Sequence, residues 1–465
     1  MADDLQKDAL SLVHSVVMGV AGTAPTFSIS ATMATLIGAV GVLAPASLLY
    51  CGLIMFGITF AYMHLNRLEA NAGASYAWVS RIFNRTLGFF AGWTLLVAST
   101  LFMVSATIPA GNATLLLLCP SLVNDQLAVT LVSMGWLVAV SLVLIRGIAL
   151  TGAVQAVMTA IELAILLVLT VAAALRFGPA AAHRLSWGQL APSAFTPAAF
   201  ASGAIIALYF FWGWDVAVNL NEETRDSARL PGLGAALAMV IITSAFTAFA
   251  AVALLALGDD EIRNASTNVI FAVADRLFPR PWSYLAVLAL MLSTIGTLET
   301  SILQFTRTMF AKSRDGALHR RWARLHADWR SPYWATLLIA GLGCLLLLLS
   351  LLFHGVGEVL KASINAIGVQ VAYYYGLAGF ACAWHFRHRA RQSLADLVLM
   401  VAWPALSAVA LWASAVVAVS QFDLPTALIA VGGVLLGAVP LGANRQARER
   451  VAATPPMAGR PSDGG

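Results

Sequence analysis

The feature that most constrains this chain is a series of apolar segments, each about 20 residues long, that recurs along most of its 465 residues. An α-helix of that length crosses a hydrocarbon core of about 30 Å. Only 11% of the residues are charged, whereas soluble domains contain roughly 25% charged residues. We therefore predict an all-α polytopic membrane protein.

The apolar segments predict twelve transmembrane helices. If the N-terminus is cytoplasmic, most of the 27 Lys and Arg residues fall in every second connection, and this asymmetry follows the positive-inside rule. An even number of spans then places both termini in the cytoplasm. The predicted spans are 10–42, 45–64, 84–118, 127–145, 151–175, 197–220, 232–257, 282–310, 333–353, 357–385, 395–419 and 425–442.

The segments outside these spans are short, and their composition excludes several classes of protein. No connection is longer than about 25 residues, and the chain contains no GxxxxGK[ST] motif, so an ATPase domain is excluded. The net charge of +5 is spread over separate connections and does not indicate nucleic-acid binding. The first apolar run is long, polar in its middle and not preceded by a basic segment, so we expect no cleaved leader.

Two predicted spans are interrupted near their middles. The first contains GVAGTAPTFS (19–28), with two glycines, one proline and three hydroxyl side chains; the sixth contains YFFWGWD (209–215), with one glycine and one acid among five aromatics. Irregular backbone at membrane depth is tolerated only where it is buried in protein or lines a cavity. Two broken helices five spans apart indicate an inverted repeat of five plus five helices, with a binding site where the breaks meet.

The chemistry of the two breaks suggests a class of ligand. Free N–H groups at a half-helix N-terminus suit a carboxylate, whereas free carbonyls and an acid suit an ammonium, so a ligand carrying both is an amino acid.

The predicted repeat divides the chain into five segments. The expected segments are a cytoplasmic N-terminus (1–9), the first repeat (10–175), the second repeat (197–385), two peripheral helices (395–442) and a disordered cytoplasmic tail (443–465).

Four segments, in order, resemble those of the amino acid–polyamine–organocation (APC) permease superfamily, of the bacterial amino acid permease type. The resemblance runs from Leu10 to Phe386, although GTA stands where many members have GSG and His319 stands where a proline is common. The segments are GVAGTAPTFS (19–28), AYMHLNRLEANAGASYAWVSRIFNRTLGFFAGW (61–93), FFWGWDVAVNLNEETRDSARLPG (210–232) and TRTMFAKSRDGALHRRWARLHADWRSPYWA (306–335).

The resemblance implies a LeuT-like fold with discontinuous first and sixth helices, and it implies a set of substrate-binding residues. In the first helix, backbone N–H groups and a hydroxyl would hold a substrate carboxylate. In the sixth, aromatic residues and an acid would face the substrate, and the third helix would contribute two hydroxyls. These residues are Gly22, Thr23 and Ala24; Tyr209, Phe211, Trp212 and Asp215; and Thr100 and Ser105.

Glu162 lies in the fifth predicted span, where several proton-coupled relatives carry a lysine. Ionisable residues inside a membrane are functional by default, and a buried carboxyl can bind and release a proton once per transport cycle. We therefore expect a proton as the coupling ion, with Glu162 carrying it. The alternative is that Glu162 only bonds freed backbone N–H groups and fixes helix packing.

Two other acids are expected in the gate or pathway. Glu222, with Glu223, follows the sixth span beside Arg225 and Arg229, where it suits a gate-closing ion pair. Glu299 in the eighth span suits either the pathway or a pair with Arg307, two turns along the helix. The sequence contains no metal-ligand spacing and no nucleophile–base pair, so neither a cofactor nor an enzymatic activity is expected.

These features predict a secondary active transporter that moves an amino acid or a related amine across the bacterial cytoplasmic membrane by alternating access. Proton coupling is favoured over exchange, but antiporters share this fold. A polyamine or other cationic-amine carrier is the alternative within transport. A non-transporting solute sensor is the alternative of a different class, although the connections are too short for a signalling domain. The specific solute and the oligomeric state stay open.

Overall fold

The computed structural model describes residues 4–352 and 356–443, and the predicted tail beyond residue 443 lies outside them. Throughout these two ranges the chain forms helices and no β-strand, and one isolated bridge pairs Leu10 with Thr224. Ten helical segments in the described ranges are long and apolar enough to cross a membrane. The prediction of an all-α polytopic membrane protein is therefore confirmed.

The helices vary in length from single turns to more than 30 residues. A π-helical stretch, Leu397–Ala402, joins two of them. In chain order they are α1 (Leu12–Thr23), α2 (Pro25–Val40), α3 (Ala44–Leu68), α4 (Ser75–Ile82), α5 (Arg85–Leu118), α6 (Gln126–Ile145), α7 (Ile148–Phe177), α8 (Pro197–Phe210), α9 (Val216–Asn219), α10 (Leu230–Ala256), α11 (Asp259–Ala265), α12 (Val269–Leu277), α13 (Leu285–Arg314), α14 (Tyr333–Ser350), α15 (Val356–Phe386), α16 (Leu394–Asp396), α17 (Trp403–Ser420), α18 (Leu424–Leu435) and α19 (Ala438–Ala443).

The helical segments match most of the predicted spans, and the differences fall in the first and second spans and in the sixth. The first two predicted spans lie in one helical run, Leu12–Leu68, because a single 3₁₀ turn at Gly41–Leu43 joins α2 to α3. The sixth is represented by α8, which has only 14 residues before its helix breaks. The twelve-span topology and the inverted repeat remain predictions.

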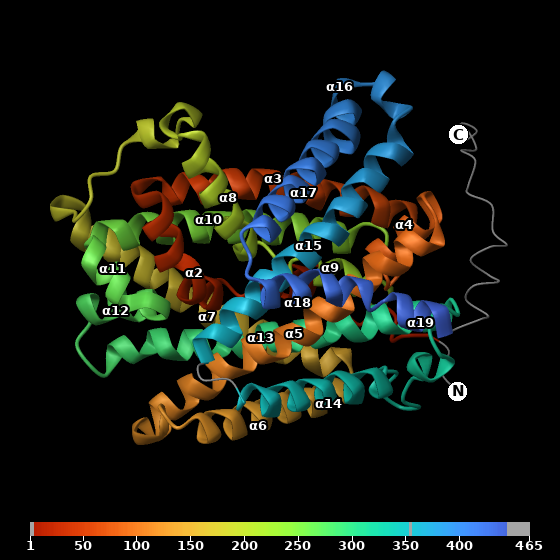
Figure 1. The fold of residues 1–465 in the computed structure, drawn as a ribbon, viewed down its shortest axis with the longest axis horizontal. Helices are drawn as coiled ribbons and strands as arrows, with labels where there is room; N and C mark the ends of the chain where they lie inside the picture. The colour runs from red at the N-terminus through yellow and green to blue at the C-terminus, as the bar shows by residue number, and fades with distance from the viewer. Residues whose placement is uncertain (1–3, 353–355, 444–465) are drawn as a thin grey trace.

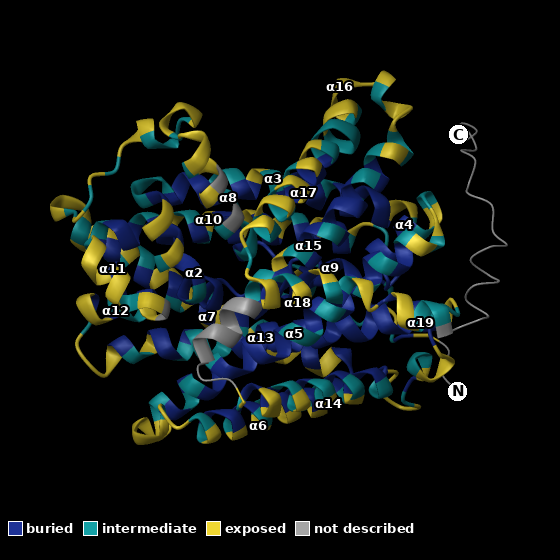
Figure 2. Ribbon diagram, viewed as in Figure 1, coloured by how far each residue is buried: buried dark blue, intermediate teal, exposed yellow. Residues whose placement is uncertain are grey.

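The centre of the molecule is built on α5 and α13, which run alongside each other (Figure 1). Helix α15 packs on both α5 and α17, and α10 packs on α3 and α1. Figure 2 shows buried residues concentrated around α9, α13 and α5, while α6, α14 and α17 expose their outer faces. Those outer faces carry exposed leucines and valines, which suits contact with lipid chains.

The two ends of the long helices carry different elements. Helices α11 and α12 lie at one end of the molecule, and α4 and α19 lie at the opposite end (Figure 1). Helices α2 and α8 contact each other, and α1 contacts both α9 and α13. The two predicted helix breaks are thereby brought together in the buried centre, between the two ends.

Candidate functional site

The break in the first helix is confined to one residue. Helix α1 ends at Thr23, Ala24 adopts the left-handed conformation (φ 49°, ψ 72°), and Pro25 begins α2. Positive φ is uncommon for a residue with a Cβ, whereas proline suits the first helical position, where its missing N–H would be unpaired in any case. The sequence GTAP therefore produces a sharp junction with few freed backbone groups.

The break in the sixth helix is longer and touches the first. The segment between the end of α8 at Phe210 and the start of α9 at Val216 is irregular, and Gly213 has φ 105°. A Cβ at Gly213 would overlap the carbonyl oxygen of Gly22, and a Cβ at Gly22 would overlap the carbonyl oxygen of Gly213. Both positions require glycine because the two backbones approach this closely.

Asp215 lies fully buried directly beyond that contact and accepts three hydrogen bonds. The Tyr375 hydroxyl donates to Oδ1 over 2.7 Å. The other carboxylate oxygen, Oδ2, accepts from Gln304 Nε2 at 2.6 Å and from the Tyr374 hydroxyl at 3.2 Å. The partners come from α13 and α15. None of them was predicted from the sequence, because the run Tyr373–Tyr375 is also typical of helix packing. An acid held by neutral donors keeps its negative charge available for a cation.

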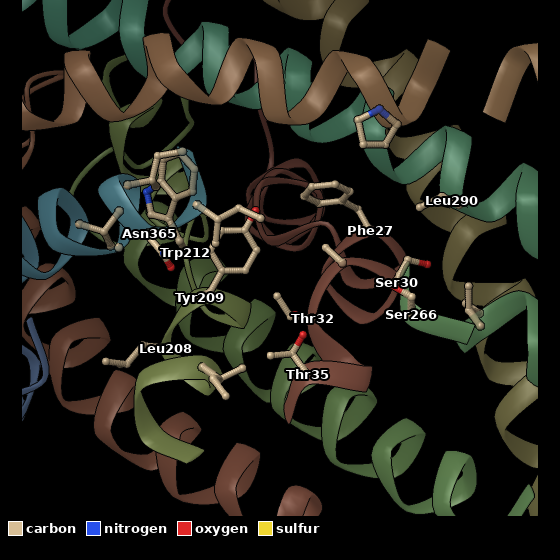
Figure 3. Close-up of a pocket in the computed structure, with 18 of the residues that line it drawn as sticks. Phe27, Ser30, Thr32, Thr35, Leu208, Tyr209, Trp212, Ser266, Leu290 and Asn365 are labelled. Carbon is tan, nitrogen blue, oxygen red and sulfur yellow. The ribbon is translucent and has the colours of Figure 1, made fainter. Parts of the chain in front are cut away.

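A cavity of about 1050 Å³ lies next to this cluster. The rings of Phe27, Tyr209 and Trp212 face it (Figure 3). The hydroxyl oxygens of Tyr209 and Ser30 are buried and have no hydrogen-bond partner among the described residues. Further polar lining residues include Asn112, Asn124, Ser266, Asn268 and Asn365.

Trp212 separates the cavity from Asp215. Its indole N–H donates to the Tyr374 hydroxyl at 2.8 Å, and that hydroxyl donates in turn to Asp215. Its ring meets Phe102 edge to face, with centroids 4.9 Å apart. Asp215 itself does not line the cavity in this state, so a ligand reaches its carboxylate only if Trp212 moves.

The expected carboxylate-binding positions in the first helix are all engaged within the protein. Gly22 and Thr23 belong to the last turn of α1, and the Ala24 N–H donates to the carbonyls of Val20 and Ala21. The Thr23 hydroxyl donates to Gly19 O at 2.8 Å.

Glu162 lies on α7, fully buried, and reaches the start of α2. Its Oε1 accepts the Thr26 backbone N–H at 3.0 Å. The neighbouring Phe27 N–H donates to the Ser293 hydroxyl of α13 at 3.2 Å, and the Thr297 hydroxyl of α13 donates to Gly22 O at 3.0 Å. The helix break is thus bonded to α7 and α13, and Glu162 supplies the only charged group among these contacts.

The remaining predicted substrate residues lie away from the cavity. Thr100 donates its hydroxyl to Leu96 O within its own helix, and Ser105 is buried without a partner in the described chain. Phe211 packs against Phe246, with centroids 5.6 Å apart. Glu299 is also buried, and its Oε1 has no partner within the described ranges.

Glu222 and Glu223 follow the sixth helix, and in the structure they pair with arginines other than the expected ones. Glu223 pairs with Arg307 through two hydrogen bonds of 2.8 and 2.9 Å, and both side chains are buried. Glu222 pairs with Arg314, also through two bonds. Arg307 therefore does not pair with Glu299. Sequence spacing favoured local partners, whereas α13 supplies both arginines from a distant part of the chain.

We call the two ion pairs Glu223–Arg307 and Glu222–Arg314 the closure. The two acids of the closure also make hydrogen bonds with the backbone of two other segments. Glu222 accepts the Ala72 N–H at 2.9 Å, while Leu10 N–H donates to Glu223 O at 3.0 Å. Beside the closure, just after α13, burial raises the pKa of the Asp315 carboxyl above its ordinary value, and Arg314 opposes that shift. None of the four ion-paired residues lines the large cavity.

A short hydrogen-bond chain connects Asp215 to this closure. The Gln304 amide donates both to Asp215 and to Asn219 Oδ1, the latter at 3.2 Å. Asn219 donates to Ala72 O at 3.0 Å, and the Ala72 N–H is the group held by Glu222. Three residues, Gln304, Asn219 and Ala72, therefore link Asp215 to Glu222 of the closure.

Comparisons with known proteins decide the family. A profile described as "Amino acid permease" matches residues 6–439. The chain belongs to the amino acid permease family. The permease is 24% identical, over 425 residues, to the "Low-affinity putrescine importer PlaP" of Escherichia coli (strain K12), a match that covers 87% of this chain and 88% of that protein. The importer of E. coli O157:H7 matches to the same extent.

Family membership confirms the resemblance to the APC superfamily and makes this permease an integral membrane protein that transports an amino acid or an amine. It is a transporter and not an enzyme. Within the described ranges the permease also contains no group of three or more His, Cys, Asp or Glu side chains that would hold a metal ion.

Proposed function

We propose that this protein is a secondary active transporter of a small amine or amino acid in the bacterial cytoplasmic membrane, with Asp215 as the residue that binds the substrate's ammonium group. The observation that carries the proposal is the buried Asp215 carboxylate, which accepts three hydrogen bonds from neutral donors where the two helix breaks meet. A buried acid without a cationic partner is costly unless a cation visits it.

Access to Asp215 requires movement of the aromatic layer. Trp212, Tyr209 and Phe27 face the cavity, and their rings suit an organic ammonium through cation–π attraction. Once the substrate passes Trp212, it replaces the hydroxyl and amide donors around Asp215. The pairs Glu223–Arg307 and Glu222–Arg314 block the opposite exit in this state, as alternating access requires.

Glu162 is proposed to couple transport to protons. An ionised carboxylate accepts the Thr26 N–H more strongly than a neutral carboxyl does. Protonation therefore weakens the bond that ties the start of α2 to α7 and frees the broken helix to move. The position of this carboxyl, at the break rather than in the cavity, supports a coupling role over a substrate contact.

Binding of radiolabelled putrescine and of tyramine to the purified protein tests the role of Asp215. In Asp215→Asn the side-chain size is kept and the charge is lost, so affinity for both amines should fall at least tenfold. Thr100→Val is the control, because its hydroxyl bonds only its own helix. Equal affinity in Asp215→Asn and the wild-type protein would remove Asp215 from the site.

An exchanger would have the same site geometry. It differs in that it changes from inward-open to outward-open only when a substrate is bound. A non-transporting sensor would bind the same amines without turnover. Uptake into proteoliposomes, with and without a trapped internal amine, separates these alternatives: an exchanger requires the internal amine, and a sensor shows no uptake in either case.

A further inference from the structure

The N–H groups at the start of α2 are all accounted for within the protein. Pro25 has no N–H, Thr26 donates to Glu162, and Phe27 donates to Ser293. The next N–H, that of Ser28, makes the first bond within the helix, to Ala24 O at 2.8 Å. The first N–H groups of a helix are those that ordinarily remain free to bind an anion, and here none of these N–H groups is free.

The group that occupies this helix start is itself negatively charged when ionised. The N-terminus of a helix carries a partial positive charge that favours an anion. Glu162 places a carboxylate there from α7, 3.0 Å from the Thr26 N. A second carboxylate brought by a ligand would meet both an occupied donor and a like charge, and like charges in a buried site disfavour each other.

The cationic side chains inside the described part of the molecule do not offer an alternative partner. Arg307 donates to both carboxylate oxygens of Glu223 and to the Thr306 hydroxyl, and it does not line the cavity. Lys312 is buried against the rings of Phe89 and Tyr76 and donates to Phe89 O at 2.8 Å, close to the ion-paired closure rather than the cavity. The residues that line the cavity are uncharged as far as the structure describes them.

We infer that the substrate is an organic amine without an α-carboxylate, rather than an amino acid. This inference rests on the proposed function, with Asp215 as the ammonium site, and narrows its substrate class. An amino acid would need an acid for its ammonium group and free N–H donors for its carboxylate; Asp215 supplies the acid, whereas Glu162 and Ser293 already occupy the donors at the start of α2. The remainder of the amine lies along Trp212, Tyr209 and Phe27, whose side chains line the cavity.

Matched pairs of amines and amino acids test this inference, because each pair differs only by the carboxylate. The purified full-length protein is titrated with tyramine against tyrosine and with cadaverine against lysine, and each titration follows the thermal unfolding midpoint. We expect each bound amine to have at least tenfold higher affinity than its amino acid. An amino acid that binds as tightly as its amine overturns the inference but leaves the ammonium site intact. If no member of either pair binds or is transported, the proposed function itself fails.

Two variants test whether the occupied donors are the cause of the discrimination. Glu162→Gln keeps an acceptor for Thr26 but removes the charge, and Ser293→Ala releases the Phe27 N–H. In each, the ratio of amine affinity to amino acid affinity should fall by about threefold or more. Thr294→Val is the matched control on α13, since the Thr294 hydroxyl bonds only Leu290 and Met291 of its own helix; its ratio should stay at the wild-type value. Unchanged ratios in both test variants would contradict the inference.

Discussion

Asp215 is held by donors from two helices that the sequence does not place beside it. The residue itself, with Trp212 and Tyr209, was predicted because an acid and aromatic rings surround a glycine in a broken span. Gln304, Tyr374 and Tyr375 were missed, because the rotation of one helix against another depends on packing and not on any single segment's periodicity. The run Tyr373–Tyr375 is the one signal in the sequence that could have drawn attention to two of them.

Tyr375→Phe removes the 2.7 Å bond to Asp215. A hydrogen bond to a charged group contributes about 1.5–3 kcal/mol, so the variant should change amine affinity by roughly tenfold. Although the bound amine replaces this hydroxyl at Asp215, we expect weaker amine binding, because the hydroxyl also accepts from the Gly213 N–H and so holds the shape of the break. Tyr373→Phe is the control, since that ring stacks on Trp412. Equal affinities in the two variants would contradict the assigned geometry.

Glu162→Gln should flatten the pH dependence of uptake. In the wild-type protein, lowering the external pH protonates Glu162, weakens the bond to Thr26 and accelerates transport. The glutamine variant mimics the protonated form at every pH, so its uptake should be independent of pH between about 5 and 8, whereas Glu162→Asp should keep a pH dependence. A glutamine variant with the wild-type pH profile would make Glu162 a packing residue only.

The helix breaks and the closure depend on contacts between helices that lie far apart in the sequence. The sequence predicted both breaks, but the structure shows that the first is a single-residue junction, because Pro25 starts α2 immediately after Ala24. The partners of Glu222 and Glu223 were placed on the wrong segment, since α13 folds back beside α9. A single sequence gives no signal for that contact.

Gln304→Leu breaks the chain of hydrogen bonds between Asp215 and Asn219. We expect the closure to open without substrate, which would raise the rate of thiol labelling at a cysteine introduced as Ala72→Cys, a buried position. Thr300→Val is the control on α13, because the Thr300 hydroxyl bonds only its own helix. Labelling that stays slow in Gln304→Leu would show that this chain of bonds does not hold the closure.

The two ion pairs of the closure should differ in their effect on stability. Arg307→Met leaves Glu223 buried and unpaired, which costs about 3–5 kcal/mol in typical buried pairs. Arg314 and Glu222 are partly exposed, and pairs of that kind contribute about 0–1 kcal/mol. Thermal unfolding should therefore shift much more for Arg307→Met than for Arg314→Met, and the double variant Arg307→Met with Glu223→Gln should recover part of the loss. Equal shifts for the two arginines would contradict the burial of the inner pair.

The molecule as a whole shows why composition was sufficient for its class and insufficient for its substrate. The apolar segments predicted a polytopic membrane protein, and the family profile over residues 6–439 confirms the superfamily that four short segments indicated. In the inference made above, the substrate class depends instead on whether a few backbone N–H groups are free, and their partners Glu162 and Ser293 come from α7 and α13. No local pattern encodes those contacts.

The central claim is that the protein carries an amine across the membrane by way of Asp215. Counterflow tests it most directly: proteoliposomes preloaded with unlabelled putrescine, or with tyramine, are diluted into a trace of the same labelled amine. The account predicts that internal label for at least one amine rises well above one molecule per protein and then decays, and that Asp215→Asn abolishes this rise. Label that never exceeds the bound stoichiometry in the wild-type protein, with either amine, would contradict the account.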